Sequence, residues 1–182
     1  MKKKIFIGLG IVLLLVIAYE GYQIATTKSH SPSETKEFSF NGVDMKVVYC
    51  RPYKKGRLIF GEGKDGALLP NGKYWRLGAN EATEITFTKN ITFGGQPVNA
   101  GSYRMYAVPN ATTWKVALNS ELGKWGAFEP DHGLDVLSVD VPVQDNLPET
   151  EQFTINFTSD STTSHIDFIW DKTKVSVPIT AQ

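Results

Sequence analysis

The fold class is decided by residues 38–47, which read FSFNGVDMKV. Apolar and polar residues alternate on both sides of Asn41-Gly42, and an Asn-Gly pair between two such runs is the strongest short-range signal for a β-hairpin. The same two-residue period recurs in short runs as far as residue 179. These runs lie at residues 85–87, 91–93, 103–107, 114–118, 136–141, 153–157, 166–170 and 175–179. The pattern predicts an all-β fold.

The spacing of the runs, with turn residues between them, indicates about nine or ten short strands. We expect an antiparallel two-sheet sandwich of the jelly-roll type, with a closed β-barrel as the alternative.

The N-terminus follows a different pattern, because three lysines at residues 2–4 precede an apolar run from Ile5 to Tyr19. A basic start followed by such a run is typical of a signal peptide or a membrane anchor. We expect residues 1–25 to be an uncleaved single-pass anchor, with a cleaved signal peptide as the alternative, and residues 26–37 to be a polar tether. Residues 38–182 are then a single domain outside the cytoplasm, in the periplasm or at the cell surface.

The composition of the chain limits which classes of partner and cofactor we expect. The 19 Lys and Arg residues balance the 19 Asp and Glu residues, so the chain lacks the basic excess of a nucleic-acid-binding protein. The one cysteine, Cys50, cannot form an intramolecular disulfide, and we expect it to be a small buried residue. His30 falls in the expected tether, which leaves two histidines for the domain. Because the domain has few histidines and a single cysteine, we expect no metal and no cofactor. Because the charge of the chain is balanced, we expect no nucleic-acid partner.

Three segments interrupt the two-residue period, and local rules fail most often at functional or strained sites. The first covers residues 49–61, where a strand ends at Arg51 and a basic turn leads to Arg57. Both guanidinium groups offer planar forks suited to a carboxylate or a phosphate. A solvated basic loop is the alternative.

The second segment, residues 72–83, combines Trp75, Arg76, Asn80 and Glu81. A flat aromatic wall beside donors and acceptors is typical of a site that orients a polar ligand. The alternative is a structural network, in which an arginine pairs with Glu81 and Asn80 caps exposed backbone groups.

The third segment, residues 125–133, places Trp125 on a loop near Asp131 and His132. His132 could serve as a base or a metal ligand, but one histidine beside one carboxylate is weak evidence for either role, and loop histidines are more often simply exposed.

Short motifs in these segments and elsewhere resemble a known family. They are YCRP (49–52), KGR (55–57), WRLGANEAT (75–83), AGSY (100–103), WGA (125–127) and WDKTKVSVPI (170–179). Over residues 38–179 the chain resembles the DUF2911 family, a domain of unknown function found mainly in exported proteins of Bacteroidetes-type bacteria. The resemblance implies export and a β-rich domain, and it carries no activity. Tyr53 replaces the family's usual small or polar residue, and the loop at 61–69 is longer than usual.

Three functions remain open. The first is a binding module for a small polar, anionic or glycan-like ligand. Its candidate residues are Arg51, Arg57, Trp75, Arg76, Asn80, Glu81 and Trp125. The second is a structural or interaction domain in which the same residues form a buried polar network. The third is a hydrolase centred on Glu81, with Asp131 or Glu129 as a second carboxylate about 5 to 10 Å away.

Overall fold

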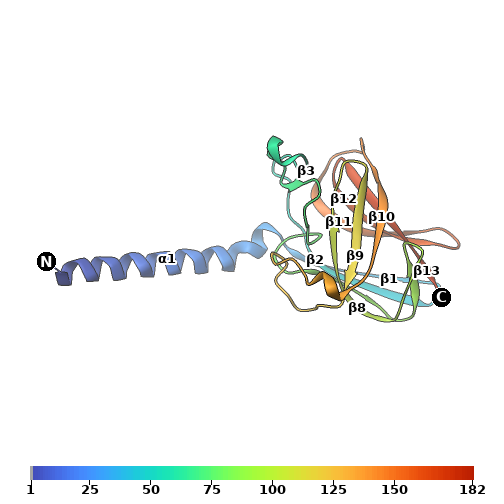
Figure 1. Ribbon diagram of the computed structural model, residues 1–182, viewed down its shortest axis with the longest axis horizontal. Coiled ribbons are helices and arrows are strands. Elements are labelled where there is room, and N and C mark those ends of the chain that lie inside the picture. The colour runs from blue at the N-terminus through green and yellow to red at the C-terminus, as the bar shows by residue number, and fades with distance from the viewer. Residues whose placement is uncertain (1) are drawn as a thin grey trace.

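The computed structural model describes residues 2–182, with the side chains of residues 2–9 and 23–25 left out of the description. A long helix, α1 (Lys2–His30), projects away from a β domain (Figure 1). The first strands are β1 (Ser33–Phe40), β2 (Val43–Cys50), β3 (Phe60–Gly61), β4 (Leu69–Pro70), β5 (Thr83–Phe87), β6 (Ile91–Phe93) and β7 (Gln96–Val98). The others are β8 (Gly101–Val108), β9 (Thr113–Asn119), β10 (Asp135–Gln144), β11 (Thr150–Ser159), β12 (Ser164–Asp171) and β13 (Thr173–Ala181). Two 3-10 turns are η1 (Gly63–Asp65) and η2 (His132–Leu134).

Helix α1 carries the apolar run of the N-terminus. Every side chain from Ile11 to Ile17 is more than half exposed. Within the described part of the chain, no helix is long and apolar enough to cross a membrane. The lysines at residues 2–4 and the start of the apolar run lie outside the described side chains, so the anchor stays a prediction.

Most of residues 26–37, which we expected to be a polar tether, belong to α1 and to strand β1. Helix α1 continues to His30, where side chains of the last turns bond back to the helix, as Ser29 Oγ does by donating to the carbonyl of Thr26. Strand β1 then begins at Ser33 and pairs with β2 along its whole length. The sequence identified only the end of this strand, at Phe38 and Phe40, because residues 33–37 at the edge of the sheet are all polar and show no alternation with apolar residues.

The strands confirm the all-β antiparallel class but not a division into two sheets. Eleven of them form one sheet, whose main path runs β1-β2-β5-β8-β9-β10-β13-β12-β11, while β3 and β4 form a small parallel pair. Strand β10 connects the two halves of the path, because its residues up to Pro142 pair with β9, whereas Val143 and Gln144 pair with β13. The closed-barrel alternative is wrong, since no ladder between β1 and β11 joins the two ends in the described chain.

One hydrophobic core takes side chains from both halves of the sheet. Its centre is Trp75, whose ring lies 5.5 Å from Trp114 on β9, 4.9 Å from Phe153 on β11 and 6.0 Å from Trp170 on β12, between ring centroids. At the open edge, Phe38 on β1 stacks on the ring of Phe157 on β11, with 5.3 Å between centroids. Aromatic packing therefore helps to close the fold between β1 and β11, where no strand ladder forms in the described chain.

The turn chemistry read from the sequence is confirmed. Asn41 and Gly42 join β1 to β2 with φ angles of 48° and 76°, as a tight hairpin turn requires. Gly94 and Gly95 join β6 to β7 with φ angles of 57° and 83°. Gly94 also lies against Val139 of β10, where an added Cβ would come within 2.7 Å of a methyl carbon.

We expect Gly94→Ala to destabilise the protein more than Gly95→Ala, by about 1–3 kcal/mol. Both substitutions place a Cβ on a residue with positive φ, but only the one at residue 94 also overlaps Val139, because nothing lies within 4 Å of a Cβ at residue 95. Urea unfolding followed by tryptophan fluorescence measures the difference. Equal losses for the two variants would show that the turn does not pack on β10.

Candidate functional site

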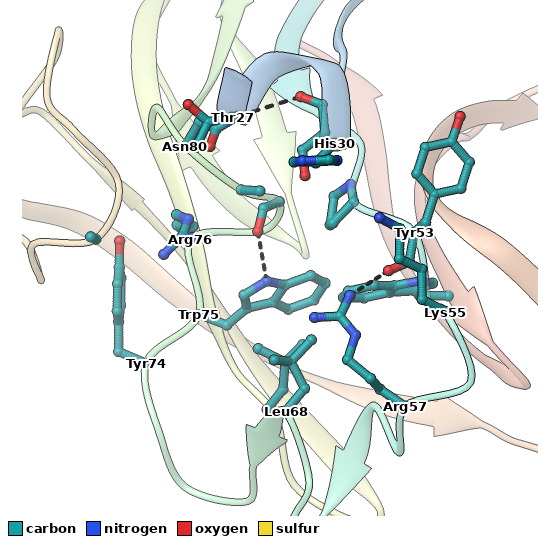
Figure 2. Close-up of a pocket in the computed structure, with 17 residues that line it drawn as sticks. Thr27, His30, Tyr53, Lys55, Arg57, Leu68, Tyr74, Trp75, Arg76 and Asn80 are labelled. Carbon is teal, nitrogen blue, oxygen red and sulfur yellow. Dashed lines mark hydrogen bonds between the residues drawn. The ribbon is translucent and has the colours of Figure 1, made fainter. Parts of the chain in front are cut away.

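A pocket with a volume of about 640 Å³ lies where α1 meets the β domain (Figure 2). Its walls come from the last turn of α1, from the loops that follow β2 and β4, and from Ala127 on the loop before η2. The pocket therefore joins parts of all three segments that the sequence singled out. A concave pocket at this position favours a ligand-binding site over a polar network that is packed without a cavity.

Three cationic side chains line this pocket, namely Lys55, Arg57 and Arg76, and no aspartate or glutamate lines it. No carboxylate of the described residues lies within 4.0 Å of their charged nitrogens. Neighbouring cations differ, because Arg51 pairs with Glu34 at 2.6 Å and Lys54 with Asp171 at 2.7 Å. Among the four cations of the loop after β2, the two without an ion pair, Lys55 and Arg57, are those that line the pocket.

Arg76 is the most buried of the three. Its Nε is shielded from solvent and has no hydrogen-bond partner among the described residues. Burial lowers the pKa of its guanidinium, since the charged form loses contact with water. Gly126 makes this burial possible, because a Cβ there would overlap Cδ of Arg76.

Arg57 is held by the backbone that precedes it. Its Nε donates to the carbonyl of Lys54 at 2.9 Å, and its Nη2 donates to the carbonyl of Tyr53 (Figure 2). A guanidinium carries five N–H donors, so these two bonds orient the group and leave three donors for a ligand.

The loop after Trp75 has an unusual backbone. Leu77 is fully buried with a φ of 53°, and Asn80 has a φ of 58°. A positive φ is strained for a bulky residue such as leucine. Gly78 fits because a Cβ there would come within 2.7 Å of the carbonyl oxygen of Cys50. Strained backbone of this kind persists where the surrounding structure imposes it, often at functional sites.

The same loop carries unused donors. The backbone N–H groups of Gly78, Ala79 and Asn80 make no hydrogen bond to any described residue, and all three residues line the pocket. Two carbonyls of the loop are bonded instead, that of Leu77 by Thr83 Oγ1 at 2.6 Å and that of Gly78 by the indole of Trp75 at 3.2 Å.

Four of the seven predicted site residues line the pocket: Arg57, Trp75, Arg76 and Asn80. Trp75 is only 4% exposed and belongs mainly to the core. Asn80 is also buried, and its amide donates to the carbonyl of Ser31 at 3.4 Å, which ties the loop to the end of α1. These two residues shape the walls, whereas the two arginines supply the charge.

Arg51 lies outside the pocket and joins three strands. It forms its ion pair with Glu34 on β1 and donates from Nε to the carbonyl of Phe153 on β11 at 3.1 Å. Its Nη2 also donates to Thr154 at 2.8 Å. Each of the three guanidinium nitrogens of Arg51 therefore has a partner within the fold.

Glu81 and Trp125 line a second pocket, of about 350 Å³. Glu81 pairs with Lys28 at 2.8 Å, so the predicted pairing with an arginine is wrong. Its other oxygen accepts a bond from the thiol of Cys50 at 3.4 Å. The hydrogen bond from Lys28 lowers the pKa of Glu81, which keeps it ionised at neutral pH and unsuited to act as a general acid.

Cys50 is 3% exposed, which confirms the prediction of a buried residue. Burial, together with the neighbouring Glu81 carboxylate, raises the pKa of its thiol. A thiol in that state is a poor nucleophile.

His132 lies in a cluster separate from the pocket. Its Nε2 is 3.1 Å from Oε1 of Glu129, and its Nδ1 is 3.0 Å from the hydroxyl of Tyr106 and 3.3 Å from Oδ2 of Asp135. The hydrogen bond with Glu129 is the main cause of the raised pKa of His132. No group of three or more His, Cys, Asp or Glu side chains in the described chain is arranged to hold a metal ion.

The sequence reasoning missed four residues at or beside the pocket. His30 was assigned to the tether, and Lys55 was passed over beside two arginines. Tyr74 lines the pocket, and its hydroxyl accepts a bond at 2.6 Å from Arg104, which is completely buried. A charged residue inside the apolar run at 103–107 was the one signal for Arg104.

Together these features describe a β-rich domain with a basic pocket at the end that carries α1. The chain belongs to the family described as protein of unknown function (DUF2911), whose model matches residues 31–179. Neither the curated proteins nor the solved structures contain a match. The resemblance read from the motifs is confirmed, and the matched region begins just before β1.

We expect Glu34→Gln to lower the free energy of unfolding by about 1–3 kcal/mol, because it leaves the largely buried Arg51 without its counter-charge. Glu81→Gln is the matched comparison and should change stability little, since its pair with Lys28 is exposed and screened by solvent. Urea unfolding of both variants measures this contrast. A larger loss at residue 81 than at residue 34 would reverse the assignment of structural and surface pairs.

We expect His132 to stabilise the protein at mildly acidic pH. Because its pKa is raised in the folded state, its contribution is fully present below the ordinary histidine value near 6.5 and disappears as the pH rises through the raised value. The difference in stability between wild type and His132→Gln should therefore be larger at about pH 5.5 than at about pH 8.5. His165→Gln, on β12, is the control. A difference that does not change with pH would contradict the ionic contacts of His132.

Proposed function

We propose that this domain is a binding module for a small anionic ligand, which it holds in the pocket beside α1. The observation that carries the proposal is the set of three cations, Lys55, Arg57 and Arg76, that line a pocket without a carboxylate and have no ion-pair partner. Lys55 and Arg57 are exposed, but Arg76 is half-buried, and a charge partly withdrawn from water without a counter-charge raises the free energy of the folded state. An anionic ligand removes that cost.

The pocket's size and donors fit such a ligand. Its volume of about 640 Å³ is in the range of small-molecule sites. Guanidinium groups bind carboxylates and phosphates through two parallel hydrogen bonds, and such charge-assisted bonds are about twice as strong as neutral ones. Leu68 and Trp75 add an apolar surface between the donors (Figure 2).

The structural alternative accounts for only part of the predicted set. Arg51, Trp75 and Asn80 have partners within the fold, as a structural role requires. Arg57 and Arg76 keep donors without partners, and Arg76 does so although it is half-buried. A hydrolase centred on Glu81 has less support, because that carboxylate is outside the basic pocket and is neutralised by Lys28.

We also propose that α1 anchors the domain outside the cytoplasm. The basic start and the apolar run up to Tyr19 support this location. The last turn of α1 supplies Thr27 and His30 to the pocket, so the ligand would bind close to the point where the domain leaves its anchor.

We expect small carboxylates or inorganic phosphate to raise the thermal unfolding midpoint of the full-length chain, while their neutral amide or alcohol analogues do not. Arg76→Gln should weaken binding by about 10- to 100-fold, as expected when one charge-assisted contact is lost. Isothermal titration at low salt measures the affinities, since added salt screens the interaction.

The matched control is Lys115→Gln, an exposed lysine on β9 that does not line the pocket. This variant should bind like the wild type. Equal binding by the Arg76 and Lys115 variants, or no stabilisation by any anion, would refute an anion site in this pocket.

A further inference from the structure

The cations of the pocket lie on two opposite walls. Figure 2 shows Arg76 on the side of Asn80, whereas Arg57 and Lys55 lie on the other side, next to Tyr53. The two walls come from different loops, one after β4 and one after β2. Any ligand that neutralises both must therefore reach across the pocket.

The first wall offers donors of two kinds. Arg76 contributes a guanidinium with no ion-pair partner and an Nε with no hydrogen bond. The backbone N–H groups of Gly78, Ala79 and Asn80 are unused as well, within the described residues. Successive backbone N–H groups in a loop that turns through left-handed residues form concave anion sites. The φ angles of Leu77 and Asn80 give this loop that character.

The second wall offers a pre-oriented fork. Arg57 is fixed by the carbonyls of Tyr53 and Lys54 and retains three N–H donors. Lys55 adds an ammonium group that forms no ion pair in the described chain. Lys54 does not contribute, because it is already held by Glu149 and Asp171.

The surface between the two walls is uncharged. In Figure 2 the indole of Trp75 and the side chain of Leu68 lie between Arg76 and Arg57. No acidic side chain interrupts this floor. An anion seated against one wall would have its partners on that side only, and the cations across the uncharged surface would keep no counter-charge.

We propose that the ligand is an elongated dianion, with an oxyanion at each end and an uncharged middle. One end binds Arg76 and the Gly78–Asn80 backbone, and the other binds Arg57 and Lys55. This inference rests on the proposed anion-binding function and adds the class of the ligand. Once one end of the ligand is bound, binding of the other end is intramolecular. The affinity therefore depends on how well the length of the ligand matches the separation of the two walls.

The test is isothermal titration of the full-length chain with straight-chain α,ω-dicarboxylates, from malonate to sebacate. The probes for comparison are monocarboxylates with the same number of carbons. Affinity for the dicarboxylates should pass through a maximum with chain length and exceed that of the matched monocarboxylate by at least about tenfold.

Variants assign the two ends. With the best dicarboxylate, Arg57→Gln and Arg76→Gln should each reduce affinity to that of the matched monocarboxylate, while Lys115→Gln leaves it unchanged. Lys55→Gln probes the second wall independently at an exposed position. Urea unfolding of each variant confirms that it is folded.

The possible results of the titrations distinguish failure of the dianion proposal from failure of the anion-binding function on which it rests. Monocarboxylates that bind as well as dicarboxylates of every length would overturn the dianion while leaving a simple anion site. An affinity that rises steadily with chain length and responds to neither arginine variant would indicate apolar binding and would also overturn it. No binding of any carboxylate or of inorganic phosphate would overturn both.

Discussion

The packing of Trp75 is the interaction on which both the fold and the pocket depend. Its ring contacts aromatic residues of both halves of the sheet, and its backbone pairs with Ala107 of β8 through bonds of 2.7 and 2.8 Å. A buried tryptophan fixes position strongly, because it combines a large apolar area with specific ring geometry. Since Arg76 follows directly, the cationic wall begins at the most constrained point of the core. The packing of Trp75 therefore fixes the backbone position of Arg76.

The distribution of ion pairs distinguishes structural charges from available ones. Arg51 and Lys54 belong to the same loop as Arg57, yet both are paired, one with β1 and the other with β12. Arg57 instead bonds to carbonyls of its own turn, which orient its fork without neutralising it. Balanced net charge conceals this arrangement, because nineteen cations and nineteen carboxylates sum to zero whether or not one pocket contains only cations. Local pairing, rather than composition, carries the functional signal.

The elements that were predictable are those in which local chemistry determines local structure. The hairpin at Asn41-Gly42 needs only residues that tolerate positive φ between alternating runs. The continuity of the sheet was not predictable, because it depends on β10 changing partners at Val143, which pairs with Val175 far along the chain. Strand β1 was taken for a tether for a related reason. At the edge of the sheet, pairing with β2 holds residues 33–37, which are all polar and carry no apolar alternation.

At the candidate site, proximity in sequence predicted only in part which residues lie in the same pocket. Asn80 and Glu81 are neighbours in sequence and were assigned to one site, but the positive φ of Asn80 turns the chain and sends Glu81 into a different pocket, where it meets Lys28. Lys28 lies on α1, as does His30, which lines the basic pocket itself. The end of the helix thus lines the basic pocket and forms an ion pair with Glu81, which lines the second pocket. Displacing it would remove a wall from one pocket and a counter-charge from the other, so α1 and the β domain form one structural unit at this end.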